Sequence, residues 1–347
     1  MASVTLDAVT FRYPGSQGET LEALSLLVPD KSTHALLGAS GAGKTTVLNL
    51  LSGSLKPTSG RILLDNVEVS KLPSAQRNVT QVFQFPVLYP AMTVRENLQF
   101  PLRNRGWKRA DALARATEIA RELDIEPLLE SGLKALTLFE RQLVAIGRAL
   151  VRPDVGLVLL DEPLTAVQPE LKWQLRKALR KVQTDLGVTM IYVTHDQTEA
   201  LTFAAEVSVM QGGRILQTGS PIDVHDKPSH DYVGFFIGSP GMNFLEVEVR
   251  QRRVALAGWP LMSTLAADGD YRIGFRAEWA TLGATGLPIK VTGFRADGLV
   301  DDAPVGVVTA QFGSTRLHVR HRGDLPGTDV CLQVKKYLLF KEGRRVD

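Results

Sequence analysis

The chain has 347 residues, enough for two domains of ordinary size, and its 44% hydrophobic and 22% charged residues are those of a globular protein. Its 40 basic and 37 acidic residues give a net charge of +3, which gives no support to nucleic-acid binding, so we expect no nucleic acid among its partners. The single cysteine, Cys331, excludes an internal disulfide and a cysteine-based zinc site, and it favours a reducing compartment.

The first predicted element is a strand at the N-terminus. Residues 1–15 read MASVTLDAVTFRYPG, which alternates in hydrophobicity and lacks the charged start and apolar centre of a signal peptide. No stretch of the chain reaches the ~18 apolar residues that a membrane-spanning helix needs. We therefore expect that any role at a membrane depends on a partner.

The most informative element is the loop of residues 38–45, which reads GASGAGKT and fits the phosphate-binding pattern G-x-x-x-x-G-K-[ST]. An apolar strand, THALLGAS, leads into this P-loop, and a helix with the sequence TTVLNLLSG follows it and is expected to end at Gly53. Glycines let successive N–H groups point at phosphate oxygens, and a helix N-terminus attracts the same anion. The pattern predicts that Lys44 reaches the β- and γ-phosphates and that the Thr45 hydroxyl binds Mg²⁺.

Strands are indicated for most of the chain up to about residue 80, with a turn at KPTSG followed by a strand over RILLDNVEV. Residues 90–150 indicate helices instead. Thr93 and Glu96 have the spacing of a capping box, and residues 111–123 place small and apolar side chains on one face of a helix.

Residues 155–235 return to alternating helices and strands, including an amphipathic helix expected to end at Gly187. The predicted fold class is therefore α/β, a nucleotide-binding core with a helical insertion at about residues 88–152. Beyond this region, short β-like runs separated by Gly, Pro and Asp turns indicate a small β-barrel or sandwich. We expect two domains, residues 1–235 and 236–347.

Acidic and polar side chains follow three of the predicted strands. Residues 157–162 read LVLLDE, an apolar run typical of an inner parallel strand, so Asp161 is expected to hold Mg²⁺ and Glu162 to accept a proton from water. His195 ends the strand MIYVTHD, where a donor to the γ-phosphate or to water is useful. Gln84 follows VTQVF, and its neutral amide could orient water near Mg²⁺.

Each of these residues also has a purely structural interpretation. An acidic strand end is often a solvated turn, and a single histidine at a strand end is more often structural. Tyr13, in TFRYPG, is either an ordinary strand aromatic or a platform for an adenine ring. The presence of the P-loop favours the functional interpretation of the acidic strand end, because an acidic strand end is the part that a P-loop enzyme otherwise lacks.

Several stretches together resemble the ATPase subunit of an ATP-binding-cassette (ABC) transporter. They are GASGAGKT, Gln84 with LYPAMTVRENLQFPL, LVLLDEP, THDQTEAL at 194–201, and GRILQTGSPIDVHDKP at 213–228. The chain more narrowly resembles the sugar-importer group that includes the maltose and glycerol-phosphate import ATPases. GFFIGSPGMNFL at 234–245 and RIGFRAE at 272–278 resemble that group's junction and its C-terminal OB-like domain, so the resemblance covers nearly the whole chain.

The resemblance implies an ATPase that uses ATP and Mg²⁺ and works as a dimer at the cytoplasmic face of the inner membrane. Its partners would be two transmembrane permease subunits and, indirectly, a solute-binding protein. Each ATP would lie between one subunit's P-loop and the other's signature loop. The resemblance also implies that Tyr13 stacks on adenine, that the Gln84 region couples to the permease, and that the all-β C-terminal domain can be regulatory.

The expected site residues fall into three overlapping sets. The expected catalytic residues are Glu162, His195, Gln84 and Lys44. The expected ATP-binding residues lie in the P-loop, near it and at the strand ends: Tyr13, Gly38, Ser40, Gly41, Ala42, Gly43, Lys44, Thr45, Thr46, Gln84, Asp161 and His195. The expected Mg²⁺ ligands are Thr45, Gln84 and Asp161.

The chain departs from the family at its signature, LSGGQ, where residues 136–140 read LTLFE. Thr137 replaces the serine, and Leu138 and Phe139 replace two glycines that let backbone N–H groups approach the partner's γ-phosphate. Glu140 replaces the glutamine; at ~6 Å and an effective dielectric constant of ~20, its charge would repel polyphosphate by on the order of 2–3 kcal/mol. Thr137 and Glu140 still form a capping box, so the helix is expected to start normally.

A second departure lies in the loop that follows Glu162. Residues 165–168 read TAVQ where the family usually has SALD, so Gln168 replaces an acidic residue. In the family dimer this loop and the signature serve the opposite subunit's ATP, whereas the residues serving the chain's own ATP are intact. We therefore predict a heterodimer with a second ATPase, in which one site hydrolyses ATP and the other turns over slowly. The alternative is a neutral change that leaves the site catalytic.

The predicted function is ATP hydrolysis that energises the uptake of a small polar solute, such as a sugar, a polyol or a glycerol derivative. One alternative is a regulatory ATP-binding subunit with little hydrolysis, against which the intact Glu162 and His195 argue. Another is a non-transport ABC ATPase acting on DNA or ribosomes, against which the single cassette, near-neutral charge and importer-like C-terminal domain argue. Solute choice is expected to belong to the permease and binding protein.

Overall fold

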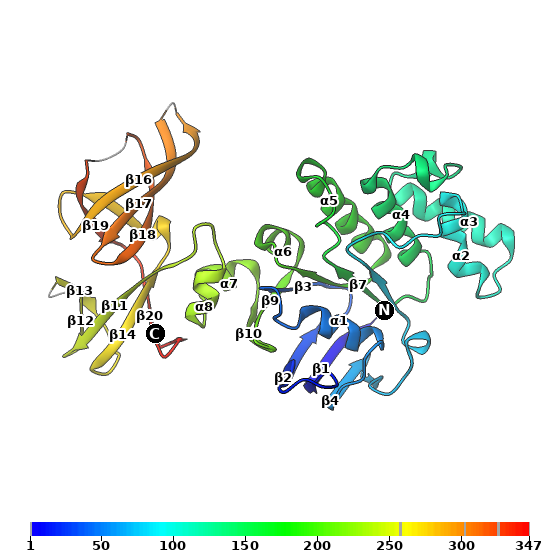
Figure 1. The fold of residues 1–347 in the computed structure, drawn as a ribbon, viewed down its shortest axis with the longest axis horizontal. Coiled ribbons are helices and arrows are strands. Elements are labelled where there is room, and N and C mark those ends of the chain that lie inside the picture. The colour runs from blue at the N-terminus through cyan, green and yellow to red at the C-terminus, as the bar shows by residue number, and fades with distance from the viewer. Residues whose placement is uncertain (1, 257–258, 302, 325–326, 347) are drawn as a thin grey trace. The chain divides into compact units, whose positions relative to one another are not determined.

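The computed structural model describes residues 2–256, 259–301, 303–324 and 327–346. Its contacts divide the chain into two compact units, Met1–Pro221 and Ile222–Asp347 (Figure 1). The domain border that we expected after residue 235 stays a prediction, and the two units below follow the division by contacts. None of the helices within the described ranges is long and apolar enough to cross a membrane.

A six-stranded sheet forms the centre of the first unit, with the strand order β10-β9-β3-β8-β7-β6. All neighbours pair in parallel except β10 and β9, which are antiparallel. Every residue of β3 and of β8 is buried, as expected for inner parallel strands that are covered on both faces. The strands are β3 (Thr33–Gly38), β6 (Val79–Val82), β7 (Leu157–Asp161), β8 (Thr189–Thr194), β9 (Glu206–Gln211) and β10 (Arg214–Gly219).

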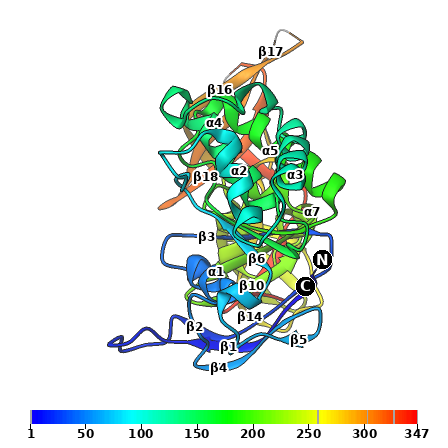
Figure 2. The ribbon, with the colours of Figure 1, turned by 90° about the vertical axis from the view of Figure 1, so that its right-hand side faces the viewer.

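A second, antiparallel sheet of the first unit has the order β2-β1-β4-β5. Its strands are β1 (Val4–Phe11), β2 (Leu21–Val28), β4 (Ser59–Leu64) and β5 (Val67–Glu68). Helix α1 (Lys44–Ser52) lies between this sheet and the parallel sheet (Figures 1 and 2). One apolar core joins the three layers, since Val47 and Leu51 of α1 share it with residues of both sheets.

The expected helical region is formed by α2 (Val94–Arg103), α3 (Arg109–Glu122) and α4 (Leu138–Leu150), which pack against one another. Both predicted capping boxes are confirmed, with Thr93 and Glu96 at the start of α2 and Thr137 and Glu140 at the start of α4. Gly147 on α4 lets this helix approach α2 closely, because a Cβ at residue 147 would lie only 2.9 Å from Cδ2 of Leu98 on α2. The first unit also contains α5 (Pro169–Leu186), which ends at Gly187 as predicted, and α6 (Gln197–Phe203).

The prediction of one continuous strand over RILLDNVEV is wrong. β4 ends at Leu64, and the chain reverses through Asp65 and Asn66 before β5 begins at Val67. Both turn residues have positive φ, 49° and 62°, which aspartate and asparagine tolerate better than other non-glycine residues. The run was interpreted as one strand because its apolar residues continue on both sides of this two-residue turn.

The second unit begins with two short helices, α7 (Pro221–Asp226, whose first residue belongs to the first unit) and α8 (Asp231–Phe236), and is otherwise built from two antiparallel sheets. One sheet has the order β13-β12-β11-β14-β20-β21 and the other β15-β19-β16-β17-β18. A shared core joins them, with Val247 and Ile273 from the first sheet and Ile289 and Leu317 from the second. The predicted all-β C-terminal part is therefore confirmed. Its strands are β11 (Asn243–Arg250), β12 (Arg253–Leu256), β13 (Trp259–Ser263), β14 (Gly269–Phe275), β15 (Ala280–Gly283), β16 (Leu287–Val300), β17 (Ala303–Phe312), β18 (Thr315–Arg322), β19 (Asp329–Val334), β20 (Leu338–Lys341) and β21 (Arg344–Arg345).

A buried arginine fastens the helices of the second unit to its sheet. Arg276, which directly follows β14, donates to the carbonyl oxygens of His225 (Nη2, 2.6 Å), Gly234 (Nη1, 2.9 Å) and Ile237. Burial lowers the pKa of its guanidinium to about 10. These carbonyl oxygens satisfy a buried cation that would otherwise be costly, and the hydrogen bonds fasten α7 and the end of α8 to the residue that follows β14.

We expect His34 to make the first unit sensitive to acid. Its imidazole is buried in β3, Nε2 lies 2.9 Å from Ser208 Oγ, and burial lowers its pKa to about 4. Glu206 lies 3.8 Å from Nδ1, but its carboxylate is half exposed, so solvent screens this attraction. Because the unfolded state takes up the proton first, the stability contributed by neutral His34 is present above pH 6.5 and is lost as the pH falls towards 4, by on the order of 3 kcal/mol.

Urea unfolding of the wild type and of His34→Gln at pH 7.5 and at pH 4.5 tests this expectation. The variant should be less stable at pH 7.5 but should lose less stability between the two pH values. An equal loss in both proteins would show that other groups cause the acid sensitivity.

Candidate functional site

A cavity of about 300 Å³ lies over the P-loop, at the start of α1. Its lining consists of Thr20, Ser40, Gly41, Gly43, Lys44, Thr45, Thr46 and Glu162. Gly41 and Gly43 adopt positive φ, 82° and 98°, and a Cβ on Gly43 would lie 2.7 Å from Leu21 Cδ2. A Cβ on Gly38 would lie 2.5 Å from the Met210 carbonyl oxygen, so this position also requires glycine. The loop therefore curls around the cavity, with the N-terminus of α1 at its end.

The Lys44 side chain lies against the backbone at the start of the P-loop. Its ammonium is buried and donates to the carbonyl oxygens of Gly38 (2.8 Å) and Ala39 (3.0 Å). Burial lowers the pKa of Lys44, while Glu162 and Asp161 act in the opposite direction. Because an ammonium has three donors and the loop accepts two, Lys44 can still donate to an anion in the cavity.

Tyr13 lies beside the start of α1. Its hydroxyl is 3.2 Å from Thr46 Oγ1, and its ring packs edge-on against Phe11 at a centroid distance of 4.8 Å. The side chain is 39% exposed, so its ring combines a fixed position near the P-loop with a surface open to a ligand.

The carboxyl ends of three parallel strands bring the other expected residues to one edge of the sheet. β7 runs between β6 and β8, and Asp161 pairs in register with Val193, two residues before His195. Gln84 is half-buried two residues beyond the end of β6. Asp161 therefore meets Thr45 of the P-loop and Glu162 meets His195 at this edge, which is where ligands of open parallel sheets usually bind. The Gln84 side chain is not part of these contacts.

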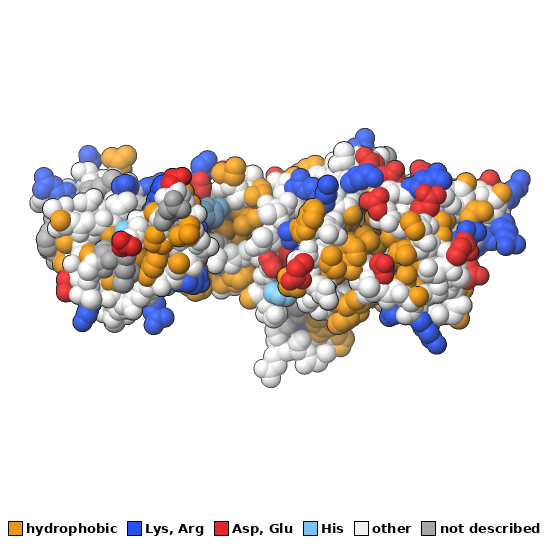
Figure 3. Space-filling view, turned by 90° about the horizontal axis from the view of Figure 1, so that it is seen from above, with side chains coloured by type: hydrophobic (Ala, Val, Ile, Leu, Met, Phe, Trp, Pro, Cys, Tyr) orange, Lys and Arg blue, Asp and Glu red, His pale blue; other side chains and the backbone are white. Residues whose placement is uncertain are grey.

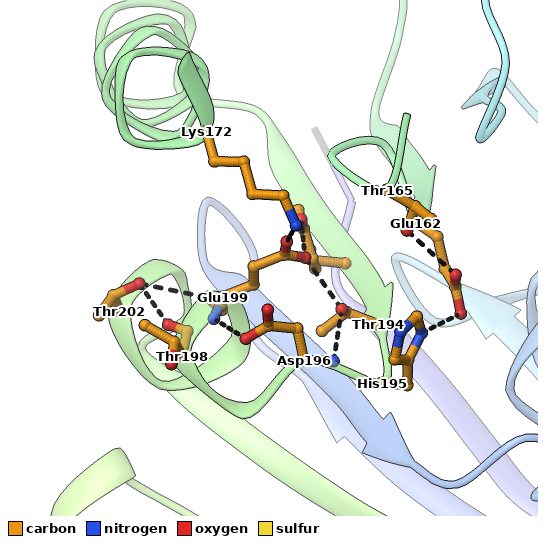
Figure 4. Close-up of polar contacts among 10 residues, drawn as sticks. Glu162, Thr165, Lys172, Thr194, His195, Asp196, Thr198, Glu199 and Thr202 are labelled. Atoms are coloured by element: carbon orange, nitrogen blue, oxygen red, sulfur yellow. Dashed lines mark hydrogen bonds and ion pairs between the residues drawn. The ribbon is translucent and has the colours of Figure 1, made fainter. Parts of the chain in front are cut away.

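Glu162 is held against His195. Its backbone has a left-handed φ of 46°, and its N–H donates to the Val193 carbonyl oxygen at 2.9 Å. Its carboxylate lies 3.0 Å from His195 Nδ1 and accepts a hydrogen bond from Thr165 Oγ1 at 3.2 Å (Figure 4). A carboxylate can only accept, so His195 carries a proton on Nδ1 in this arrangement. The unusual backbone conformation aims the Glu162 side chain at the histidine, a feature often found at functional sites.

The chemistry of Thr45 and Asp161 fits a magnesium ion. Thr45 Oγ1 donates to Asp161 Oδ1 at 3.5 Å, which brings a hydroxyl and a carboxylate together at the cavity. Burial raises the pKa of Asp161 and the neighbouring Glu162 raises it further, while the Thr45 hydrogen bond and Lys44 act in the opposite direction, so a cation at this carboxylate would be favourable. No group of three or more His, Cys, Asp or Glu side chains in the described ranges could hold a metal, so a magnesium ion at Thr45 and Asp161 would need further oxygen ligands, such as the Gln84 amide, phosphate oxygens or water.

The N-terminus of α4 is already occupied by the chain's own carboxylate. Glu140 Oε2 accepts from the Thr137 backbone N (2.7 Å) and from Thr137 Oγ1 (2.8 Å), while Thr137 Oγ1 accepts from the Glu140 N–H (3.2 Å). Leu138 is 41% exposed at the same helix end. Glu140 is thus folded back onto its own helix, where a negative charge is favourable. Gln168, the other altered residue, directly precedes α5 and makes no side-chain cap there.

Two groups of residues near the site were missed by the sequence analysis. Gln142 on α4 is buried, and its Nε2 donates to the Phe83 carbonyl oxygen at 3.1 Å, which ties α4 to the segment containing Gln84. Glu199 on α6 accepts hydrogen bonds beside His195 and is the centre of a buried network. The only signal was the place of Glu199 in the stretch THDQTEAL, three residues after Asp196, which is the spacing between a helix N-cap and the N3 residue that it contacts.

The chain is similar to known transport proteins. Residues 21–165 match the family model described as ABC transporter. The sn-glycerol-3-phosphate import ATP-binding protein UgpC of Rhodopseudomonas palustris (strain BisA53) is 44% identical over 258 residues, 74% of this chain and 71% of the relative. UgpC of Ruegeria pomeroyi is 39% identical over 335 residues, 96% of this chain and 90% of the relative.

A solved structure supports the same fold. The chain is similar to cbiO1 from Clostridium perfringens, described as part of the ABC transporter complex cbiONQ, with a TM-score of 0.60 and 28% sequence identity. The similarity covers 64% of this chain and 89% of that one.

Proposed function

The chain belongs to the ABC transporter family, as an importer ATPase of the sugar and glycerol-phosphate group, and from that premise we propose that it energises the uptake of a small polar solute. A glycerol phosphate is the first candidate, because relatives covering most of the chain carry that name. The proposal includes two permease subunits, a solute-binding protein and a position at the cytoplasmic face of the inner membrane.

The observation that carries the proposed chemistry is the Glu162–His195 pair beside the P-loop. A water oxygen bonds to the γ-phosphorus of ATP as the bond to the bridging oxygen breaks, Glu162 takes the water proton, and ADP and phosphate leave. Lys44 stabilises negative charge on the phosphates, and His195 fixes the Glu162 carboxylate. Magnesium, held by Thr45 and Asp161, would supply further charge neutralisation. Gln84, two residues beyond the end of β6, would also hold magnesium and would orient water near it.

We propose that binding of the nucleotide depends on the other P-loop residues and on Tyr13. The backbone N–H groups of residues 40–45 would surround the phosphates, and the exposed Tyr13 ring would stack on adenine. The Thr46 hydroxyl would hold Tyr13 in place rather than contact the base, because the two hydroxyls are 3.2 Å apart.

The proposed dimer contains a second, different ATPase. All residues proposed to serve this chain's own ATP are present, whereas the signature and Gln168 are altered. The charge of Glu140 supports the proposal, because its carboxylate lies at the N-terminus of α4, where it would repel a partner's phosphate and a glutamine would not. A partner with an ordinary signature would complete one competent site on this chain's P-loop.

The segment after β6 is our candidate for the permease contact. Phe83, Phe85 and Val87 are each 45–63% exposed. Figure 3 shows that hydrophobic side chains lie among charged ones on one face of the first unit. Beside them lies a groove of about 240 Å³, lined by Tyr89, Arg148 and others, in which Arg148 lies over the Tyr89 ring. Exposed aromatic residues around a groove with a cation fit a short helix of a membrane partner.

Uptake measurements in cells test the transport function. Cells lacking this gene should lose uptake of labelled glycerol 3-phosphate, and the wild-type gene should restore it. Lys44→Ala should fail to restore it, because the phosphates lose their cation, whereas Lys56→Ala, at an exposed position beyond α1, should restore it fully.

Two outcomes would contradict parts of this proposal. If uptake of a sugar or polyol is lost instead, the importer assignment stands and the glycerol phosphate is wrong. If uptake of no polar solute depends on the gene, the transport function itself is wrong.

A regulatory ATP-binding subunit is the second candidate, because the Glu140 charge at the N-terminus of α4 would impair hydrolysis on the partner's P-loop. This candidate also requires that ATP close the dimer without being hydrolysed on this chain's P-loop, against which the intact Glu162 and His195 argue. Single-turnover hydrolysis by the assembled complex separates the two: release of phosphate from ATP bound to this chain supports the ATPase, and its absence supports the regulatory subunit.

A further inference from the structure

We propose that Glu199 is a positioning residue for ATP hydrolysis, which fixes the backbone on both sides of His195 and joins it through Lys172 to α5. The inference rests on the proposed role of His195 and Glu162. The network joins three elements of the first unit: β8, which carries Tyr192 and Thr194, α6, which carries Glu199, and α5, which carries Lys172 and begins directly after the loop 162–168 (Figure 4).

Glu199 makes three side-chain contacts. Its Oε2 accepts from the hydroxyls of Tyr192 and Thr194, each at 2.9 Å, and its Oε1 accepts from Lys172 Nζ at 2.9 Å. The side chain is only 2% exposed. A buried carboxylate of this kind is costly without partners, so Glu199 and its three partner side chains form one hydrogen-bonded network.

The residues immediately before and after His195 both belong to this hydrogen-bond network. Thr194, immediately before it, donates to Glu199 and also accepts from the Asp196 N–H at 2.9 Å. Asp196, immediately after it, accepts from the Glu199 N–H at 3.1 Å through Oδ1. The backbone on each side of His195 is therefore tied to Glu199, although the imidazole itself points away from this network, towards Glu162 (Figure 4).

Burial keeps the Tyr192 hydroxyl protonated. Burial raises the pKa of Tyr192 well above its ordinary value, and the Glu199 carboxylate raises it further, so the tyrosine hydroxyl remains a donor. The Lys172 side chain is one quarter exposed and supplies the positive charge that the carboxylate needs. Removing either charge would leave its partner buried without compensation.

The same contacts tie the loop 162–168 at both of its ends. Thr165 donates to the Glu162 carboxylate, which contacts His195, and Lys172 on the first turn of α5 contacts Glu199. A displacement of this loop or of α5 would therefore move the Glu162–His195 pair. We infer that Glu199 keeps the pair aligned and couples it to the loop that carries Gln168.

The chain offers a matched control for this network. Lys181, also on α5, contacts Glu122 of α3 at 3.0 Å, and this pair is more exposed and lies outside the site. Lys172→Met and Glu199→Gln test the proposed network, whereas Lys181→Met and Glu122→Gln remove an ion pair of the same kind from the same helix. Lys172→Met is the second test in case Glu199→Gln reduces folding.

The experiment measures kcat and KM for ATP in the complex assembled from the full chain, together with nucleotide affinity and melting temperature. We expect Glu199→Gln and Lys172→Met to lower kcat by about 10- to 100-fold with KM changed less than about threefold, since misplacement of a reacting group by ~1 Å can cost that much. The control variants should keep the wild-type kcat. In a His195→Ala background, Glu199→Gln should lower kcat by less than about twofold, because its effect passes through His195.

Three results would overturn the inference: an unchanged kcat in both network variants, a loss from the control variants as large as theirs, or a full additional loss in the His195→Ala background. A wild-type complex without any ATP hydrolysis would instead contradict the proposed function, so the two failures can be distinguished.

Discussion

Glu162→Gln is expected to lower ATP turnover by the assembled transporter by about 10²- to 10⁴-fold while leaving ATP bound. The amide has the shape of the carboxylate and can still accept from Thr165 and His195, but it cannot take a proton from water. Steady-state phosphate release and retention of labelled ATP measure the two effects. Glu170→Gln, at an exposed position on the first turn of α5, is the matched control and should leave turnover unchanged.

The same substitution also tests the asymmetry of the dimer. The equivalent change in the partner ATPase should cost much less, because the site on the partner's P-loop would face the altered signature of this chain. Equal losses from both substitutions would contradict the asymmetry. An undiminished rate in Glu162→Gln would show that another group takes the proton.

Restoring the signature should produce the second large effect. The variant carries Leu138→Gly, Phe139→Gly and Glu140→Gln, and its ATP hydrolysis is measured without the partner ATPase. The rate should rise by on the order of 10²-fold, which is the usual effect on rate of one preorganised donor to a transition-state oxygen. The glycines remove the exposed side chains, and the glutamine removes the charge. Glutamine still completes a capping box with Thr137, so the start of α4 should survive.

The capping box of α2 supplies the control for this variant. Glu96→Gln makes the same chemical change at a helix end with the same hydrogen-bond pattern, and it should not raise hydrolysis. Robust hydrolysis by the wild-type chain alone, or no gain on restoration, would contradict the heterodimer proposal and favour a neutral change in the signature.

Much of the fold could be predicted because its signals are local. The P-loop, the end of α1 at Gly53, both capping boxes and the end of α5 at Gly187 each depend on a few adjacent residues whose backbone chemistry permits little else. The apolar runs of β3, β7 and β8 likewise predicted buried parallel strands. The turn at Asp65 and Asn66 was missed because the hydrophobic pattern continues across it.

Less of the site could be predicted, because its contacts join residues that are distant in sequence. Glu162 and His195 were each expected near the nucleotide, but their contact depends on the register of β7 against β8 and on the left-handed backbone of Glu162. Glu199 gave only a weak signal, since a glutamate on a short helix is usually exposed. Its burial becomes visible only when β8, α5 and α6 pack together.

The sequence by itself determined the class of chemistry, because a P-loop, an acidic strand end and a histidine strand end need only short stretches of chain to be recognised. It also located the altered signature, LTLFE. It also determined where the Glu140 charge goes, onto the Thr137 N–H and hydroxyl of its own helix, because a capping box needs only residues within one helical turn. Only the tertiary structure decided that Glu199 lies buried and contacts the residues next to His195, because β8, α5 and α6 must pack together before those contacts can form.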